Sequence, residues 1–135
     1  MKNWRFTHFR IGLVILLGVT GVCLHADDPA TSGQKERAAS ALEQDIKTDP
    51  NNAELWLHLG FAYRKMDKID QAQNAFEKAA LLNPQAKDAY FMLGLIYESK
   101  HRKLEAEKAW KRYLAAETDP ERRAIAEKHI HHLGQ

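Results

Sequence analysis

The 135-residue sequence contains a single cysteine, Cys23, which lies within a run of uncharged, mostly apolar residues at 11–24. A lone cysteine cannot form an intramolecular disulfide. If the chain is cut after Ala26, the remaining protein has no cysteine nucleophile either. The sequence also has no HExxH motif, no glycine-rich phosphate loop and no GxSxG motif. We therefore expect no catalytic residues, no cofactor and no enzymatic activity.

The N-terminal segment 1–26 has the pattern of a secretory signal peptide. Lys2, Arg5 and Arg10 precede the apolar run at 11–24, and the small residue Ala26 stands ahead of two aspartates. We predict cleavage near Ala26 and delivery to the periplasm or the cell exterior. Two alternatives stay open. Residues 11–24 could remain as an inner-membrane anchor, although a membrane span usually needs about 20 apolar residues. A lipoprotein acylated at Cys23 is the other, although the preceding VTGV departs from the usual lipoprotein pattern.

The small excess of positive charge belongs to the N-terminal segment. The whole chain has a formal net charge of +2, but the part after residue 26 has 17 basic and 18 acidic residues and a net charge of −1. A protein this close to neutrality has no overall electrostatic attraction to nucleic acid. We expect no nucleic-acid partner, and contact with a membrane only through the N-terminal segment.

After residue 26 no segment alternates with the period of a β-strand, and apolar residues recur at helical spacing. Residues 27–35 contain Pro, Gly, Ser and Thr without periodicity, which predicts a linker. Prolines at 50, 84 and 120 mark helix boundaries, because a proline disfavours helix in the residue before it. The predicted helices span residues 36–47, 53–65, 69–82, 87–99, 104–116 and 121–133. Their short connections predict an all-α protein of antiparallel helix pairs.

Two helical segments repeat one phrase. LWLHLGFAY at 55–63 and AYFMLGLIY at 89–97 share an aromatic–x–x–Leu–Gly–x–x–Tyr frame, which indicates a repeated structural unit. Both units resemble the tetratricopeptide repeat, a 34-residue helix–turn–helix. The matching residues are Trp56, Leu59, Gly60, Tyr63, Ala72, Phe76, Ala79 and Pro84 in the first unit, and Tyr90, Leu93, Gly94, Tyr97, Ala106 and Trp110 in the second. The second unit then departs from the pattern, with Tyr113 at a small-residue position and a late Pro120.

The resemblance implies an α-solenoid in the region 36–134. We predict a half-repeat helix at 36–50, repeats at 53–86 and 87–120, and a capping helix at 121–133. A glycine inside a helix costs about 1 kcal/mol relative to alanine, so Gly60 and Gly94 need a structural reason. We expect them to let the two helices of each repeat approach closely, against Ala72 and Ala106.

In the tetratricopeptide family the first helices of successive repeats line a concave groove. The resemblance assigns Leu57, Phe61, Arg64, Lys65, Phe91, Leu95 and Glu98 to that groove. The family's best-known grooves use Lys and Asn to clamp a terminal carboxylate, whereas Leu and Phe here favour an apolar strip such as an amphipathic helix. Alternatively, these residues are core that the chain's own termini cover.

The resemblance implies a non-catalytic interaction module: a scaffold or adaptor for a peptide or helix of a cell-envelope protein. One alternative is a self-associating assembly subunit, in which the groove or the N-terminal end pairs with a second copy. Another is a metal-linked or catalytic role of the HIHH sequence at 129–132. His129 and His132 could share a helix face, but a zinc site usually needs three or four protein ligands. No Cys, Asp or Glu is placed to complete one, so we predict no metal site.

Overall fold

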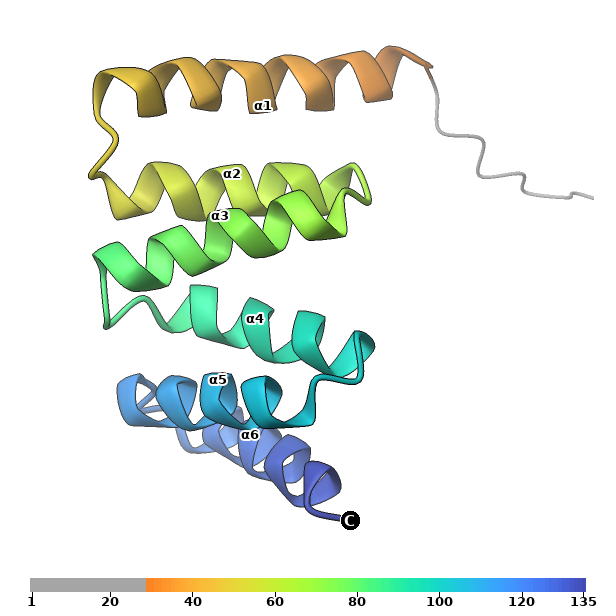
Figure 1. Cartoon of the computed structure of the whole chain (residues 1–135), viewed down its shortest axis with the longest axis vertical. Helices are drawn as coiled ribbons and strands as arrows, with labels where there is room; N and C mark the ends of the chain where they lie inside the picture. The colour runs from red at the N-terminus through yellow and green to blue at the C-terminus, as the bar shows by residue number, and fades with distance from the viewer. Residues whose placement is uncertain (1–28) are drawn as a thin grey trace, which may run out of the picture.

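The structure, a computed structural model, describes residues 29–135, which form six α-helices and no β-strand. The helices are α1 (Pro29–Thr48), α2 (Ala53–Lys65), α3 (Ile69–Leu82), α4 (Lys87–Ser99), α5 (Lys103–Ala116) and α6 (Pro120–Leu133). They stack in chain order from α1 to α6 (Figure 1). Each helix packs mainly on its neighbours in sequence. This is the arrangement of an α-solenoid, so the all-α prediction is confirmed.

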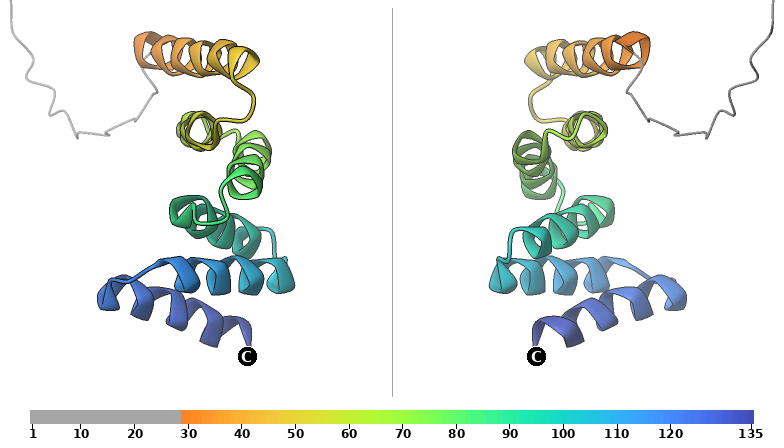
Figure 2. Two further views of the ribbon diagram at one scale, coloured as in Figure 1. Left: turned by 90° about the vertical axis from the view of Figure 1, so that its left-hand side faces the viewer. Right: turned by 90° about the vertical axis from the view of Figure 1, so that its right-hand side faces the viewer.

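The signal, anchor and acylation predictions concern residues 1–26, including Cys23, and these lie outside the described residues. Within residues 29–135, no helix combines the length and the apolar character that a membrane span requires. Figure 2 shows α1 at one end of the stack and α6 at the other.

The predicted linker at 27–35 is wrong for residues 29–35, which form the first turns of α1. A proline is tolerated at the first helical position, because the backbone N–H that it lacks would have no helical partner there. The extension also has tertiary neighbours: Ser32 and Lys35 line a small cavity together with Met66 and Asp67 of the α2–α3 turn. The other five helices begin and end within one residue of the predicted bounds.

The two repeats share the turn between their helices as well as the helices themselves. Asp67 and His101 occupy the same position in successive repeats, and both have a φ of 58°, in the left-handed region. In each turn a backbone N–H then bonds to the carbonyl of the signature tyrosine, Lys68 to Tyr63 at 2.9 Å and Arg102 to Tyr97 at 2.8 Å. The two turns are therefore more alike in backbone conformation than in sequence.

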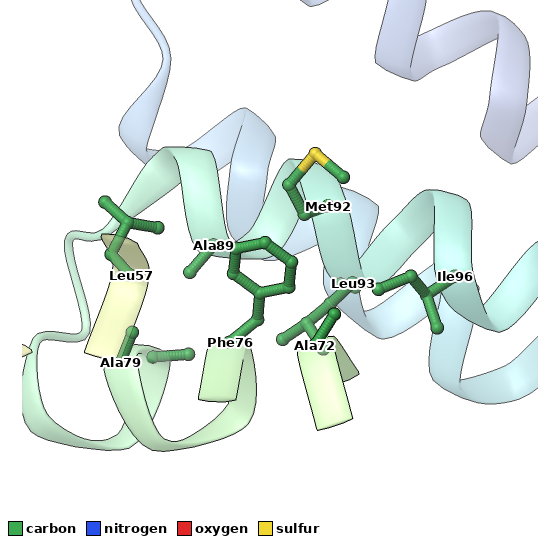
Figure 3. Packing of buried hydrophobic residues seen from close by; sticks show 10 residues of the cluster. Leu57, Ala72, Phe76, Ala79, Ala89, Met92, Leu93 and Ile96 are labelled. Carbon is green, nitrogen blue, oxygen red and sulfur yellow. The ribbon is translucent and has the colours of Figure 1, made fainter. Parts of the chain in front are cut away.

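Gly60 and Gly94 do allow close packing, but against aromatic rings instead of the predicted alanines. A Cβ atom at Gly60 would lie 2.5 Å from the Phe76 ring, and one at Gly94 would lie 2.6 Å from the Trp110 ring. Both rings are completely buried. Figure 3 shows Phe76 among the buried residues contributed by α2, α3 and α4. In each repeat, the signature glycine of the first helix and a ring of the second helix thus form the same contact.

Tyrosine–glutamate bonds join successive units. The Tyr63 hydroxyl of α2 donates to the Glu43 carboxylate of α1, and the Tyr97 hydroxyl of α4 donates to Glu77 of α3 at 2.7 Å. Burial, with the neighbouring carboxylate, raises the pKa of Tyr63 to about 12. The two bonds are one repeat apart, so α1 sits on α2 in the same way as α3 sits on α4.

Glu117 joins α4, α5 and the start of α6. Its side chain is buried and accepts hydrogen bonds from Lys87 Nζ at 3.1 Å, from the Tyr113 hydroxyl at 3.1 Å and from the backbone N–H of Asp119 at 3.0 Å. The Asp119 N–H is the largest of the influences that lower the pKa of Glu117 to about 2. Tyr113, the departure from the repeat pattern, therefore has a defined role at this junction.

Replacing Gly60 with alanine is expected to lower the free energy of unfolding by up to about 2 kcal/mol. The gain in helix propensity, about 1 kcal/mol, is outweighed by overpacking against the enclosed Phe76 ring, which typically costs about 1–3 kcal/mol. Gly33→Ala is the matched control, because nothing lies within 4 Å of the added Cβ. That variant should be more stable by up to about 1 kcal/mol. Urea unfolding measures both, and a gain for Gly60→Ala would contradict the packing role.

Candidate protein-binding surface

The seven residues predicted to line a groove occupy different environments. Leu57 is buried in the core beside Phe76, Ala89 and Met92, because α3 and α4 both cover α2 at this point. It is therefore a core residue and not an accessible contact. Figure 3 shows it in this cluster.

The part of the predicted groove on α4 is engaged within the chain. Phe91 is half-buried, and its ring lies 5.3 Å from that of Trp110 and 5.4 Å from that of Tyr113. Leu95 packs against a cluster of α5 and α6 residues. The aromatic contacts are edge-to-face and tilted pairs of the kind that stabilise cores. Phe91 and Leu95 thus pack on α5 and α6, in agreement with the alternative that these groove residues belong to the core.

Glu98, expected at the groove rim, is used as an acceptor at the junction of α4, α5 and α6. Trp110 donates its Nε1–H to Glu98 at 2.8 Å, and His129 Nδ1 lies 2.9 Å from the same carboxylate. The His129 ring also stacks on Trp110, with 4.4 Å between the ring centroids. Together these contacts hold α6 against the second repeat.

The C-terminal histidines do not assemble a metal site in the described part of the chain. His129 and His132 line a cavity of about 330 Å³ with Glu98, His101 and Lys103. No group of three His, Cys, Asp or Glu side chains within residues 29–135 is arranged to hold a metal ion. The hydrogen bond to Glu98 gives His129 a structural role.

The accessible part of the predicted surface lies at the other end, between α1 and α2. A cavity of about 480 Å³, which we call the α1–α2 trough, is lined by Lys35, Ala38 and Leu42 of α1 and by His58, Phe61, Ala62 and Lys65 of α2. Two of the predicted residues, Phe61 and Lys65, are among them, and Arg64 is exposed beside Lys65. Phe61 packs edge-to-face on Phe76 at 5.2 Å, so a buried ring fixes its position.

The trough combines an apolar floor with a basic lining. Ala38, Leu42, Phe61 and Ala62 supply the apolar surface, and every charged or titratable side chain in the lining is a lysine or a histidine. His58 is exposed, and its Nε2 lies 3.9 Å from the Glu54 carboxylate one turn earlier. Such a surface can bind an apolar strip that has acidic residues along its edge.

The sequence predicted a half-repeat helix at 36–50, in which Ala38 and Leu42 lie one period before Ala72 and Phe76, but it did not place these two residues in a binding surface. The available signal was the half-repeat itself. A second helix without the first helix of its repeat leaves one face uncovered, and the first repeat helix should border that face.

Replacing Glu98 with alanine is expected to lower the free energy of unfolding by about 1–3 kcal/mol, because the buried indole N–H of Trp110 loses its acceptor. Glu98→Gln keeps an acceptor oxygen and loses only the charge facing His129, so its effect should be smaller. Urea unfolding followed by circular dichroism distinguishes the two variants. Equal losses would contradict a role for Glu98 as the Trp110 acceptor.

Comparison with known proteins agrees with this architecture. One family model described as tetratricopeptide repeat matches residues 62–126, and a second of the same description matches residues 30–85. The crystal structure of MamA is 27% identical, with a TM-score of 0.65 over 77% of this chain and 59% of MamA. The first tetratricopeptide domain of Spaghetti (RPAP3), bound to an HSP90 peptide, is 23% identical, with a TM-score of 0.65 over 78% of this chain and 87% of that domain.

Among curated proteins, a bifunctional subunit, NrfFG, of the formate-dependent nitrite reductase complex of Haemophilus influenzae is 40% identical over 50 residues. The match covers 37% of this chain and 13% of that subunit. The chain spans between 5% and 13% of the length of the curated relatives that it matches. The likeness is therefore one of repeat units and not of whole proteins.

Proposed function

Since the chain belongs to the tetratricopeptide repeat family, we propose that it is a non-catalytic adaptor that holds a peptide or helix of a cell-envelope protein. Domains of this family mediate protein–protein interaction, and the matched families indicate no catalytic activity. The RPAP3 domain, similar in fold, was solved with a bound peptide. The adaptor role needs only an accessible surface of defined chemistry.

The observation that carries the proposal is the α1–α2 trough. It is the accessible portion of the predicted surface, whereas Phe91, Leu95 and Glu98 pack on α5 or α6. Arg64 and Lys65 are exposed next to it and would set the register and the specificity of a bound segment. The working surface is therefore the N-terminal end of the stack.

The N-terminal residues support a location outside the cytoplasmic membrane. Cleavage near Ala26 would release the domain there, and acylation at Cys23 would tether it on the same side. Retention of residues 11–24 as an anchor would give the same result, because the three basic residues that precede the run favour the cytoplasmic side. All three outcomes present the trough to envelope partners.

In-cell photo-crosslinking tests the adaptor role. We expect a photoreactive phenylalanine analogue at position 58, where the side chain is exposed within the trough, to give one discrete crosslinked band that mass spectrometry identifies. The same analogue at Lys78, exposed on α3 and outside the trough lining, is the control and should not give that band. Crosslinks from position 58 only to this chain, or the same band from both positions, would contradict the adaptor role at the trough.

A further inference from the structure

We propose that the α1–α2 trough takes one amphipathic helix from a partner protein, and that this helix completes the half-repeat begun by α1. The inference rests on the proposed function and gives that function a defined ligand: a helix with a small-to-medium apolar face and acidic flanks. The comparison of the pair α1 and α2 with the equivalent pair α3 and α4 supports it, because α3 and α4 show how the same surfaces look when a helix covers them.

The α1 side of the trough is a face that the repeat normally buries. Ala38 and Leu42 lie one period before Ala72 and Phe76, which have no exposed surface because α2 covers them. Ala38 is exposed and Leu42 only half-buried, because within residues 29–135 no helix precedes α1 to cover them. The difference lies in the missing neighbour, since each pair of residues occupies the same position in the repeat.

The α2 side of the trough is likewise more exposed than the equivalent face of α4. Met92 and Ile96 of α4 are each 5% exposed. Their equivalents one period earlier, His58 and Ala62, are exposed and half-buried. A first helix placed before α1 would cover them as α2 helps to cover α4. The residue types are consistent with an exchangeable neighbour. The polar His58 side chain can face water when no helix covers it, whereas the apolar Met92 at the equivalent position suits a permanently buried core.

A second cavity near α1 is not a surface that a missing helix leaves uncovered. It has a volume of about 410 Å³, lies on another side of α2 and includes Trp56, Leu59 and Tyr63 in its lining. A counterpart exists in the second repeat, a cavity of about 190 Å³ with Tyr90, Leu93 and Tyr97 at the equivalent positions. The cavity beside Trp56, Leu59 and Tyr63 is therefore a regular feature of the repeat and not a sign of an uncovered end. The α1–α2 trough has no such counterpart among the described cavities.

The lining specifies the helix that fits. The first helices α2 and α4 are each 13 residues long, so we expect an occupant of similar length. Leu42 stands where the larger rings of Phe76 and Trp110 meet a glycine, so the occupant can carry alanine or a larger residue at that contact. Lys65 and the neighbouring Arg64 favour glutamate or aspartate at its edges by charge complementarity.

Two synthetic peptides, each long enough for about four helical turns, serve as probes. Both carry Leu and Ala at helical i, i+3, i+4, i+7 spacing, and one has glutamate and the other lysine at the flanking positions. Fluorescence anisotropy with the full chain measures their binding. We expect the glutamate peptide to bind at least about tenfold more tightly than the lysine peptide, a difference of about 1.4 kcal/mol.

Ala38→Glu places charge and bulk in the apolar floor and should weaken binding of the glutamate peptide by at least about tenfold. Ser40→Glu is the matched control, because Ser40 is exposed on the same helix and does not line the trough. It adds the same charge two residues away, and we expect binding within about twofold of the unaltered chain. Because both replaced residues are exposed, circular dichroism should show the same helix content in both variants.

Several results would overturn the inference. Equal binding of the two peptides, or equal losses in the two variants, would remove the acidic helix as the ligand. Dimerisation that Ala38→Glu abolishes would make a second copy the occupant. Binding that requires removal of residues 1–28 would make that segment the occupant. If position 58 still crosslinks to an envelope protein in cells, the adaptor function stands even when this inference fails.

Discussion

Each helix of the two repeats has more apolar surface than one partner can cover, and the rest of the structure follows from that constraint. Within a repeat, a glycine brings the two helices close enough for a buried ring to fill their interface, as with Gly60 and Phe76. Between repeats, the next helix covers the remaining face, and a tyrosine–glutamate bond such as Tyr97–Glu77 fixes its position. Neither interface is complete without its neighbour, which is why the repeats must stack.

The two ends of the stack meet this constraint differently. At the C-terminal end, α6 lies over the second repeat. Trp110 stacks on His129, and both rings contact the Glu98 carboxylate. At the N-terminal end, α1 supplies a second helix whose apolar face remains uncovered within the described residues. An end that is uncovered yet still packed on α2 can exchange a partner without unfolding the domain, and our proposal of a binding surface at α1 rests on this asymmetry.

The sequence was sufficient to predict most of the fold, because the period of the repeat ties each helix to a known position. It predicted a packing role for Gly60 and Gly94 but named the wrong partners, since spacing does not show which residue on the next helix faces a missing side chain. The start of α1 was missed because Ser32 and Gly33 resemble loop residues. The cavity that Ser32 lines together with Met66 and Asp67 of the α2–α3 turn is visible only in three dimensions.

The candidate site was predicted less completely. Phe61 and Lys65 lie in the trough, but the Glu98 carboxylate is used by Trp110 and His129, which are 12 and 31 residues away. A family position indicates which way a side chain points in an average repeat. It does not show that a terminal helix already occupies that side, and it does not show that, within residues 29–135, no helix covers the outer face of α1.

The most direct test of the account measures the solvent exposure of equivalent methyl groups along the stack. With a soluble paramagnetic gadolinium chelate in the sample, NMR relaxation of the full chain should be strongly enhanced at the Ala38 methyl group. It should remain weak at Ala72, its buried equivalent one period later. Equally weak enhancement at both would show that the N-terminal end is already covered, which would contradict an open binding surface at α1.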